Sequence, residues 1–211
     1  PRPKALAEIA GEALIARTMA RFEPLGLVDD AVVVHPPGYE ENFRAILQEA
    51  FPQSRIHLCE GGAERQESVT RGLALVDPQA DIVLIHDAAR PFIELDTIRA
   101  AIKAADECGA ATVATAAEDT ILESDGNGFL ARTPDRKLVW ACQTPQVFRL
   151  DVIRAAHARA TRAGKAFTDD ATLVHSFGGK VRIVPGSAKN FKITTEEDAR
   201  HADYILKRRG E

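Results

Sequence analysis

The ten residues IVLIHDAARP, residues 82–91, decide the predicted fold. The first four are apolar without alternation, which is typical of a strand buried on both faces of a parallel sheet. Ligands of open α/β sheets bind beyond the carboxyl ends of the strands, so the polar residues after this strand lie where a site is expected. Asp87 can hold a Mg²⁺ ion that bridges nucleotide phosphates. By position alone a structural interpretation is about as good as a metal site: Asp87 caps a turn, and Arg90 is a solvated rim residue.

Predicted strands and helices alternate along the chain on both sides of this stretch. Apolar runs predict strands at residues 31–35, 56–59, 111–116, 139–148 and 181–184. Apolar residues at helical spacing predict helices near residues 43–50, 69–76, 98–105, 150–156, 170–177 and 194–208. Thr194 and Glu197 are expected to form the capping box of the last helix. The pattern predicts an α/β fold with a doubly wound, mostly parallel, Rossmann-like sheet, in a single domain over residues 1–211.

The pattern breaks between residues 118 and 136. Residues 120–123 and 129–132 flank the turn sequence SDGNG, which predicts a β-hairpin arm that protrudes from the domain. A two-stranded ribbon with few apolar residues is marginal by itself. We therefore expect the arm to pack against a second subunit in a homodimer.

Composition limits the classes of protein that this chain can belong to. The 211 residues carry a net charge of −4 and no long basic run, which argues against a nucleic-acid partner. No apolar run is long enough to span a membrane. Cys59, Cys108 and Cys142 lie far apart without metal-ligand spacing, which indicates a reduced, cytoplasmic protein.

Two further features suggest phosphate chemistry. The segment GGAERQES, residues 61–68, lies between a predicted strand and a helix, where backbone N–H groups can face a ligand; an ordinary connecting loop is the favoured alternative for a Gly-Gly pair alone. Lys4, Arg136 and Lys192 are isolated cations of the kind that stabilises a transferring phosphoryl group. Each of them alone is more often a solvated surface charge.

Taken together, these motifs resemble one family. Its motifs occur here in order and spacing over nearly the whole chain: residues 61–68, HDAARP at 86–91, DT at 119–120, DR at 135–136, TPQ at 144–146, TDD at 168–170 and NFKIT at 190–194. The chain is thereby identified as similar to the 2-C-methyl-D-erythritol 4-phosphate cytidylyltransferases.

The resemblance implies transfer of CMP from CTP to 2-C-methyl-D-erythritol 4-phosphate, with Mg²⁺ and release of pyrophosphate. It also implies roles for individual residues. Lys4 and Lys192 resemble lysines near the reacting phosphate, and Thr120 and Arg136 resemble arm residues that grip the substrate phosphate of the neighbouring subunit. The remaining site residues by this resemblance are Asp87, Arg90, Thr144 and Thr168 on the substrate and metal side, and Gly62, Ser68 and Ala88 in the cytidine pocket.

Two departures from the family pattern stand out. Ala63 occupies a position where the family usually has Asp, so a side-chain contact to the nucleotide is expected to be lost. The family also has a strand and a glycine-rich loop ahead of the Pro3-Lys4 pair, and we expect the native polypeptide to carry both before Pro1. Three alternatives stay open: a ribitol 5-phosphate cytidylyltransferase, a non-catalytic CTP-binding module, and one half of a bifunctional enzyme with a cyclodiphosphate synthase domain.

Overall fold

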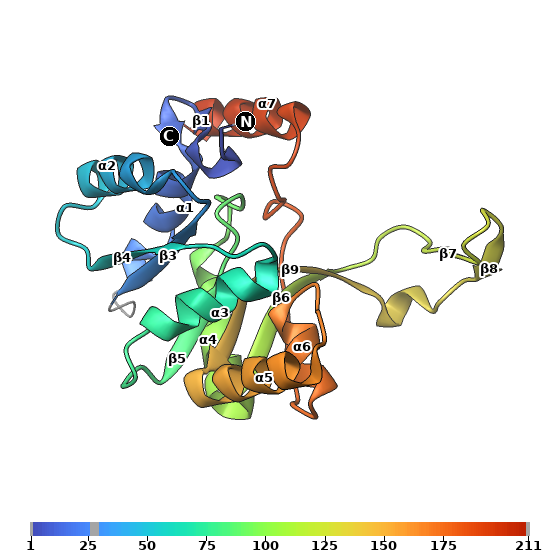
Figure 1. The fold of residues 1–211 in the computed structure, drawn as a ribbon. Helices are drawn as coiled ribbons and strands as arrows, with labels where there is room; N and C mark the ends of the chain where they lie inside the picture. The colour runs from blue at the N-terminus through green and yellow to red at the C-terminus, as the bar shows by residue number, and fades with distance from the viewer. Residues whose placement is uncertain (1, 26–29, 210–211) are drawn as a thin grey trace.

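A computed structural model describes residues 2–25 and 30–209 (Figure 1). The strands are β1 (Glu8–Ile9), β2 (Glu12–Ala13), β3 (Ala31–His35), β4 (Ile56–Glu60), β5 (Ile82–Ile85), β6 (Ala110–Ala116), β7 (Glu123–Ser124), β8 (Leu130–Arg132), β9 (Trp140–Arg149) and β10 (Arg182–Pro185). The α-helices are α1 (Leu14–Ala20), α2 (Glu40–Ala50), α3 (Arg65–Leu75), α4 (Leu95–Cys108), α5 (Leu150–Ala163), α6 (Asp170–Ser176) and α7 (Glu196–Arg209). Short 3-10 turns are η1 (Lys4–Leu6), η2 (Glu23–Leu25) and η3 (Arg136–Leu138).

The central sheet confirms the predicted α/β fold. Its four strands lie in the order β10-β6-β9-β5, and β3 pairs with β4 in a second, parallel two-stranded sheet. Because β10 is parallel to β6, and β9 is antiparallel to both β6 and β5, only β9 runs against the others in the four-stranded sheet. The sequence indicated a strand at this place but not its direction.

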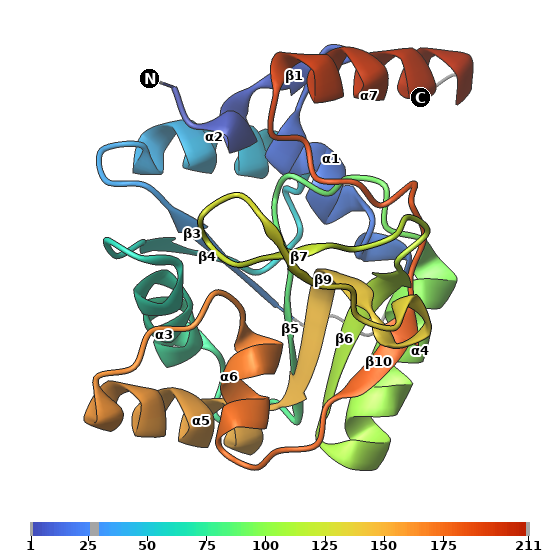
Figure 2. The same cartoon turned by 90° about the vertical axis from the view of Figure 1, so that its right-hand side faces the viewer.

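Both faces of the four-stranded sheet are covered by helices, which explains its apolar runs. Figure 2 shows α4 on one side of the sheet and α5 and α6 on the other. Neighbouring residues point to opposite sides: Val147 packs in the α4 cluster, whereas Phe148 packs in the α5 and α6 cluster, and both are fully buried. A strand buried on both faces has no polar alternation.

The two-stranded sheet lies between α2 and α3. Val33 packs with Phe43 and Leu47 of α2. On the other face Gly72 of α3 sits so close to Val34 that an added Cβ would lie 3.0 Å from its Cγ2 atom. The glycine therefore lets α3 approach the strand, and this approach brings the start of α3 to the carboxyl end of β3.

The arm is the extended connection between β6 and β9. These strands are antiparallel neighbours paired from Ala116 with Trp140 inward, and the chain between them projects from the body as the short ribbon β7–β8 (Figure 1). The predicted hairpin is thus confirmed, although its first strand covers only Glu123–Ser124. Its large apolar side chains are exposed: Ile121, Leu122, Phe129 and Leu130, with Leu138 at the base of the arm.

The capping box of α7 was predicted one residue too early. The backbone N–H of Asp198 donates to Thr195 Oγ1 at 3.1 Å, and the Asp198 carboxylate accepts from the N–H of Thr195 at 2.8 Å. Aspartate therefore replaces the expected Glu197 as the reciprocal acceptor. The N–H groups of Thr194 and Thr195 hold the pKa of Asp198 well below its usual range.

Candidate active site

The site is built around the loop that follows β5. The backbone N–H of Asp87 donates to Thr144 Oγ1 at 3.0 Å, and that hydroxyl lies 3.0 Å from His86 Nδ1. Because the hydroxyl oxygen accepts from Asp87, its proton is free to go to Nδ1, and His86 Nε2 then donates to the carbonyl of Arg90 at 3.0 Å. This chain of hydrogen bonds fixes both ends of the loop and uses both ring nitrogens of His86.

A bulge in β9 delivers Thr144 to this position. In the ladder with β6, Thr112 pairs with Gln146 and Ala114 pairs with Cys142. One β6 residue therefore faces the three β9 residues 143–145. Bulges re-aim side chains next to sites, and here the bulge turns the buried Thr144 out of the regular ladder towards the end of β5.

The carboxylate of Asp87 lies among cations. Its Oδ2 atom is 2.9 Å from Lys192 Nζ and 3.6 Å from Arg90 Nε. Burial favours the neutral acid, but the hydrogen bond and charge of Lys192, with the charges of Arg65 and Arg90, outweigh burial and hold the pKa of Asp87 below its usual value. Asp87 is therefore a charged, acceptor-only carboxylate at neutral pH.

The segment that carries Lys192 is fastened to the β5 loop. The N–H of Ile193 donates to the carbonyl of Ala89 at 2.9 Å, and Arg90 donates to the carbonyl of Asn190 at 2.7 Å. Lys4 Nζ donates to the carbonyl of Thr194. The structure thus brings Lys4, Asp87, Arg90, Thr144 and Lys192 to one end of the sheet. The carbonyl of Ala88, in the same loop, accepts from Thr18 Oγ1 at 2.7 Å.

The predicted nucleotide loop before α3 is closed by its own side chains. The N–H of Gly62 donates to Ser68 Oγ at 3.0 Å, and the N–H of Ala63 donates to Glu67 Oε2 at 2.9 Å. These N–H groups point towards the start of the helix, where an anion or a polar base edge can replace the side chains. A Cβ on Gly62 would lie 2.2 Å from Glu67 Cδ, so a larger residue here would displace the Glu67 side chain from the loop.

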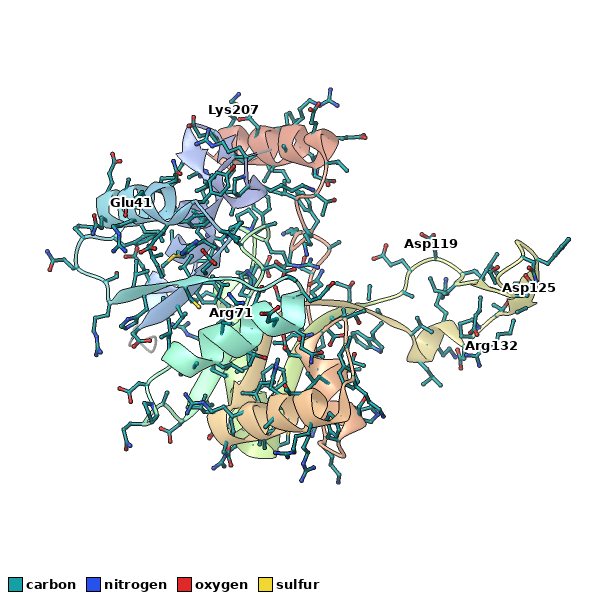
Figure 3. The ribbon with its side chains drawn as sticks, in the orientation of Figure 1. Glu41, Arg71, Asp119, Asp125, Arg132 and Lys207 are labelled. Atoms are coloured by element: carbon teal, nitrogen blue, oxygen red, sulfur yellow. The ribbon has the colours of Figure 1, made fainter. Side chains whose placement is uncertain are left out.

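Three predicted residues lie elsewhere. Thr168 is exposed before α6, where its hydroxyl donates weakly to Asp169 at 3.4 Å. Thr120 and Arg136 belong to the arm, and Arg136 donates to the carbonyl of Glu118 at 2.6 Å. Figure 3 labels Asp119, Asp125 and Arg132 along this arm, far out from the body. Within one chain the arm residues are therefore not brought to Asp87.

The sequence did not single out several residues that hold the site together. Thr18 and His86 bond to the β5 loop, and Asn190 Nδ2 donates to the carbonyl of Thr144 at 2.9 Å. Gln146 donates to Asp169 and accepts from the N–H groups at the start of α6, and Arg65 forms an ion pair with Asp170. Four of these five lie inside the quoted motifs, and the burial of Thr18, Gln146 and Asn190 is a signal that periodicity does not carry.

The carboxylate of Asp87 fits a divalent cation that is also bound by a nucleotide. Mg²⁺ is commonly held by one or two carboxylates together with substrate phosphates. Within residues 2–25 and 30–209, no group of three His, Cys, Asp or Glu side chains could hold a metal. Asp87 Oδ1 accepts no hydrogen bond from the described residues, which leaves it open to such an ion.

Two other features bear on the class of protein. A cavity of about 420 Å³ between α2 and β4, lined by residues such as Leu47, Phe51 and Ile56, contains none of the predicted site residues. No helix in the described part of the chain is both long and apolar enough to cross a bilayer. The α/β fold, with cations and one carboxylate at the strand ends, is that of an α/β nucleotidyltransferase.

Comparison with known proteins gives the family. The profile of 2-C-methyl-D-erythritol 4-phosphate cytidylyltransferase matches residues 1–208, and the chain belongs to this family. The cytidylyltransferase of this name from Pelotomaculum thermopropionicum is 40% identical over 202 residues, which cover 95% of this chain and 85% of that protein.

Two further relatives extend the comparison. The crystal structure of 4-diphosphocytidyl-2C-methyl-D-erythritol synthase from Anaerococcus prevotii gives a TM-score of 0.90 at 30% identity, over 96% of this chain and 93% of that one. A bifunctional IspD/IspF enzyme of Desulforudis audaxviator is 40% identical over 199 residues, which cover 94% of this chain and 50% of that protein. The same type of domain therefore also occurs within a longer relative.

The partly buried His86 predicts a specific pH dependence of stability. Burial lowers the pKa of His86 from 6.5 to about 4, although the Arg90 carbonyl and Asp87 favour the charged ring. The unfolded chain therefore binds more protons than the folded chain between these pH values. The free energy of unfolding should fall by about 1.5 kcal/mol from this group between pH 6.5 and pH 5, in urea titrations.

The variant His86→Gln isolates this contribution. It should be less stable than the wild type at pH 7 but should lose less stability on going to pH 5. His175→Gln, at an exposed histidine, is the matched control and should keep the wild-type slope. Identical slopes for the wild type and His86→Gln would mean that His86 is not held neutral by its environment.

Proposed function

We propose that this chain transfers the cytidylyl group of CTP to 2-C-methyl-D-erythritol 4-phosphate, which gives 4-diphosphocytidyl-2-C-methyl-D-erythritol and pyrophosphate. The observation that carries the proposal is the contact of Lys192 with Asp87 at the end of β5, beside Arg90. Family membership gives the reaction, and this cluster gives charges of the right sign where a triphosphate has to bind.

Each predicted residue has a part in this proposal. Lys4 and Lys192 stabilise the negative charge that develops on the α-phosphate, and Arg90 holds the loop that carries Asp87. The loop around Gly62 and Ser68 binds the cytidine, with the backbone at Ala88 in contact with the nucleotide. Thr144 orients Asp87, and Thr168 binds the acceptor.

The reaction needs no general base from the protein. A phosphate oxygen of the acceptor attacks the α-phosphorus, a new P–O bond forms, and the bond to the β-phosphate oxygen breaks, so that pyrophosphate leaves with the electron pair. The attacking oxygen is already anionic near pH 7, because the second pKa of a phosphate monoester is about 6. His86 is not available as a base, since both its ring nitrogens are engaged.

We propose that a divalent cation, Mg²⁺ or a similar ion, binds at Asp87 together with the nucleotide phosphates. Its positive charge would reduce the charge of the triphosphate when bound. Asp87 supplies the carboxylate, and Lys192 and Arg90 keep it ionised. The proposal also places the enzyme in the cytoplasm, because its three cysteines are free thiols.

Pyrophosphate release tests this function. With CTP, Mg²⁺ and 2-C-methyl-D-erythritol 4-phosphate the protein should release pyrophosphate, and with ribitol 5-phosphate it should be at least about tenfold slower. Lys192→Ala should lower kcat by about a hundredfold or more, because a cation at the transition state contributes roughly 3 kcal/mol. A coupled phosphate assay measures both effects.

Lys189→Ala is the matched control for Lys192→Ala. Lys189 lies in the same segment but faces only Glu94, at 3.8 Å, and its side chain is 67% exposed. Its removal should leave kcat unchanged. Faster turnover of ribitol 5-phosphate would assign the other acceptor, and binding of CTP without any pyrophosphate release would make the chain a binding module.

We further propose a two-fold homodimer formed through the arm. The arm leaves Leu122, Phe129, Leu130 and Leu138 at least 62% exposed, which is a costly surface for a single chain. A second copy can cover it with the same surface. In that arrangement Thr120 and Arg136 reach the partner's site, and the planar fork of Arg136 suits a phosphate.

Mixing two inactive variants tests the exchange of Arg136. In a mixed dimer of Lys192→Ala and Arg136→Ala, one site keeps its own Lys192 and receives an intact Arg136 from its partner. After subunit exchange at equal amounts, activity should return to roughly a quarter of the wild-type value, since half of the dimers are mixed and each has one complete site.

The double variant, with both substitutions in one chain, is the control. If Arg136 acts across the interface, mixing the double variant with an equal amount of wild type should roughly halve the wild-type activity, because mixed dimers have no complete site. Unchanged wild-type activity, with exchange verified by native mass spectrometry, would place Arg136 in its own chain's site.

A further inference from the structure

Helix α3 is hydrogen-bonded to the loop between α5 and α6 through the side-chain amide of Gln66. Gln66 Nε2 donates to the carbonyl of Lys165 at 3.2 Å, and the N–H of Phe167 donates to Gln66 Oε1 at 2.9 Å. The side-chain amide thus pairs with a donor and an acceptor of the same loop. This loop, residues 164–169, contains Thr168 and leads into the start of α6.

A buried ionic cluster fastens the far end of the same loop. The carboxylate of Asp170 is 1% exposed, and its Oδ2 atom lies 2.8 Å from Arg65 Nη1. Its other oxygen lies 3.0 Å from His157 Nε2, and His157 Nδ1 lies 2.9 Å from Thr70 Oγ1. A buried carboxylate is tolerated only when it is paired, so the start of α6 is tied to α3 directly by Arg65 and indirectly through α5.

The sheet holds the loop from a third side. Gln146 of β9 is fully buried, and its Oε1 atom accepts from the N–H groups of Asp170 at 2.9 Å and Ala171 at 3.1 Å. Its Nε2 atom donates to Asp169 Oδ1 at 3.1 Å. The backbone on the carboxyl side of Thr168 is therefore fixed, while the Thr168 side chain itself stays exposed.

We infer that Arg65 and Gln66 are positioning residues for the acceptor substrate. This inference rests on the proposed function, in which Thr168 binds the acceptor phosphate ester. Helix α3 begins at the nucleotide loop and grips the Thr168 loop within its first turn. One rigid helix therefore sets the distance between the bound nucleotide and the acceptor, although Arg65 and Gln66 contact the loop rather than the reacting atoms.

Steady-state kinetics of Gln66→Met tests the inference. Methionine keeps the length of the side chain but makes neither backbone hydrogen bond, so the KM for the acceptor should rise about tenfold. The KM for CTP should stay within about twofold, because the Gly62 and Ser68 contacts do not involve Gln66. Arg65→Met should act in the same direction, and Arg65→Lys, which keeps the charge beside Asp170, should recover part of the loss.

Arg154→Gln is the control, because it removes a contact between α5 and the other end of α3. Arg154 of α5 donates to the carbonyls of Leu73 and Val76 at 2.9 Å, remote from the Thr168 loop. Its loss should change neither KM. An unchanged acceptor KM in Gln66→Met, or an equal rise in both KM values, would overturn the positioning role.

Hydrogen exchange gives a readout that does not depend on turnover. In Gln66→Met the amides of residues 164–170 should exchange at least about tenfold faster than in the wild type, with α4 and β6 unchanged. Unchanged exchange in this loop would refute the inference even if the wild type used neither acceptor. A wild type without turnover, but with faster loop exchange in the variant, would refute the proposed reaction alone.

Discussion

The hydroxyl of Thr144 is the constraint on which the site depends. It accepts from the N–H of Asp87 and faces His86 Nδ1, each at 3.0 Å, so it sets the direction in which the chain leaves β5. This is possible only because β9 bulges opposite β6 at this position. The antiparallel β9 thereby does two things: it completes the sheet, and it orients the carboxylate that Lys192 contacts.

The sequence predicted the layers of the fold well because buried strands have uniform apolar runs. Residues 82–85 and 31–35 were predicted with the bounds that the structure gives them. The antiparallel direction of β9 was not predicted, since an apolar run has the same pattern in either direction. The small hairpin β1–β2 and helix α1 were not predicted either, because they are short and their apolar residues fit no single period.

The motifs contained several of the residues that lie at the strand ends, but they did not show how these residues are held. Lys192 meets Asp87 across more than a hundred positions of sequence, and only the fold brings them together. The polar residues His86, Gln146 and Asp170 form the supports, and each has a partner that is distant along the chain. Thr120 and Arg136 belong to the arm, which projects away from the body (Figure 1), and this is why the proposed function needs a second copy of the chain.

The location of the bound metal and nucleotide tests the central claim most directly. In crystals grown with CTP and Mn²⁺, the anomalous signal of manganese should lie beside Asp87, with the cytidine in the loop of residues 61–68 and the α-phosphate next to Lys192. This result would follow from a charged Asp87 at the end of β5. Manganese bound away from Asp87, or CTP bound in the cavity between α2 and β4, would contradict the account.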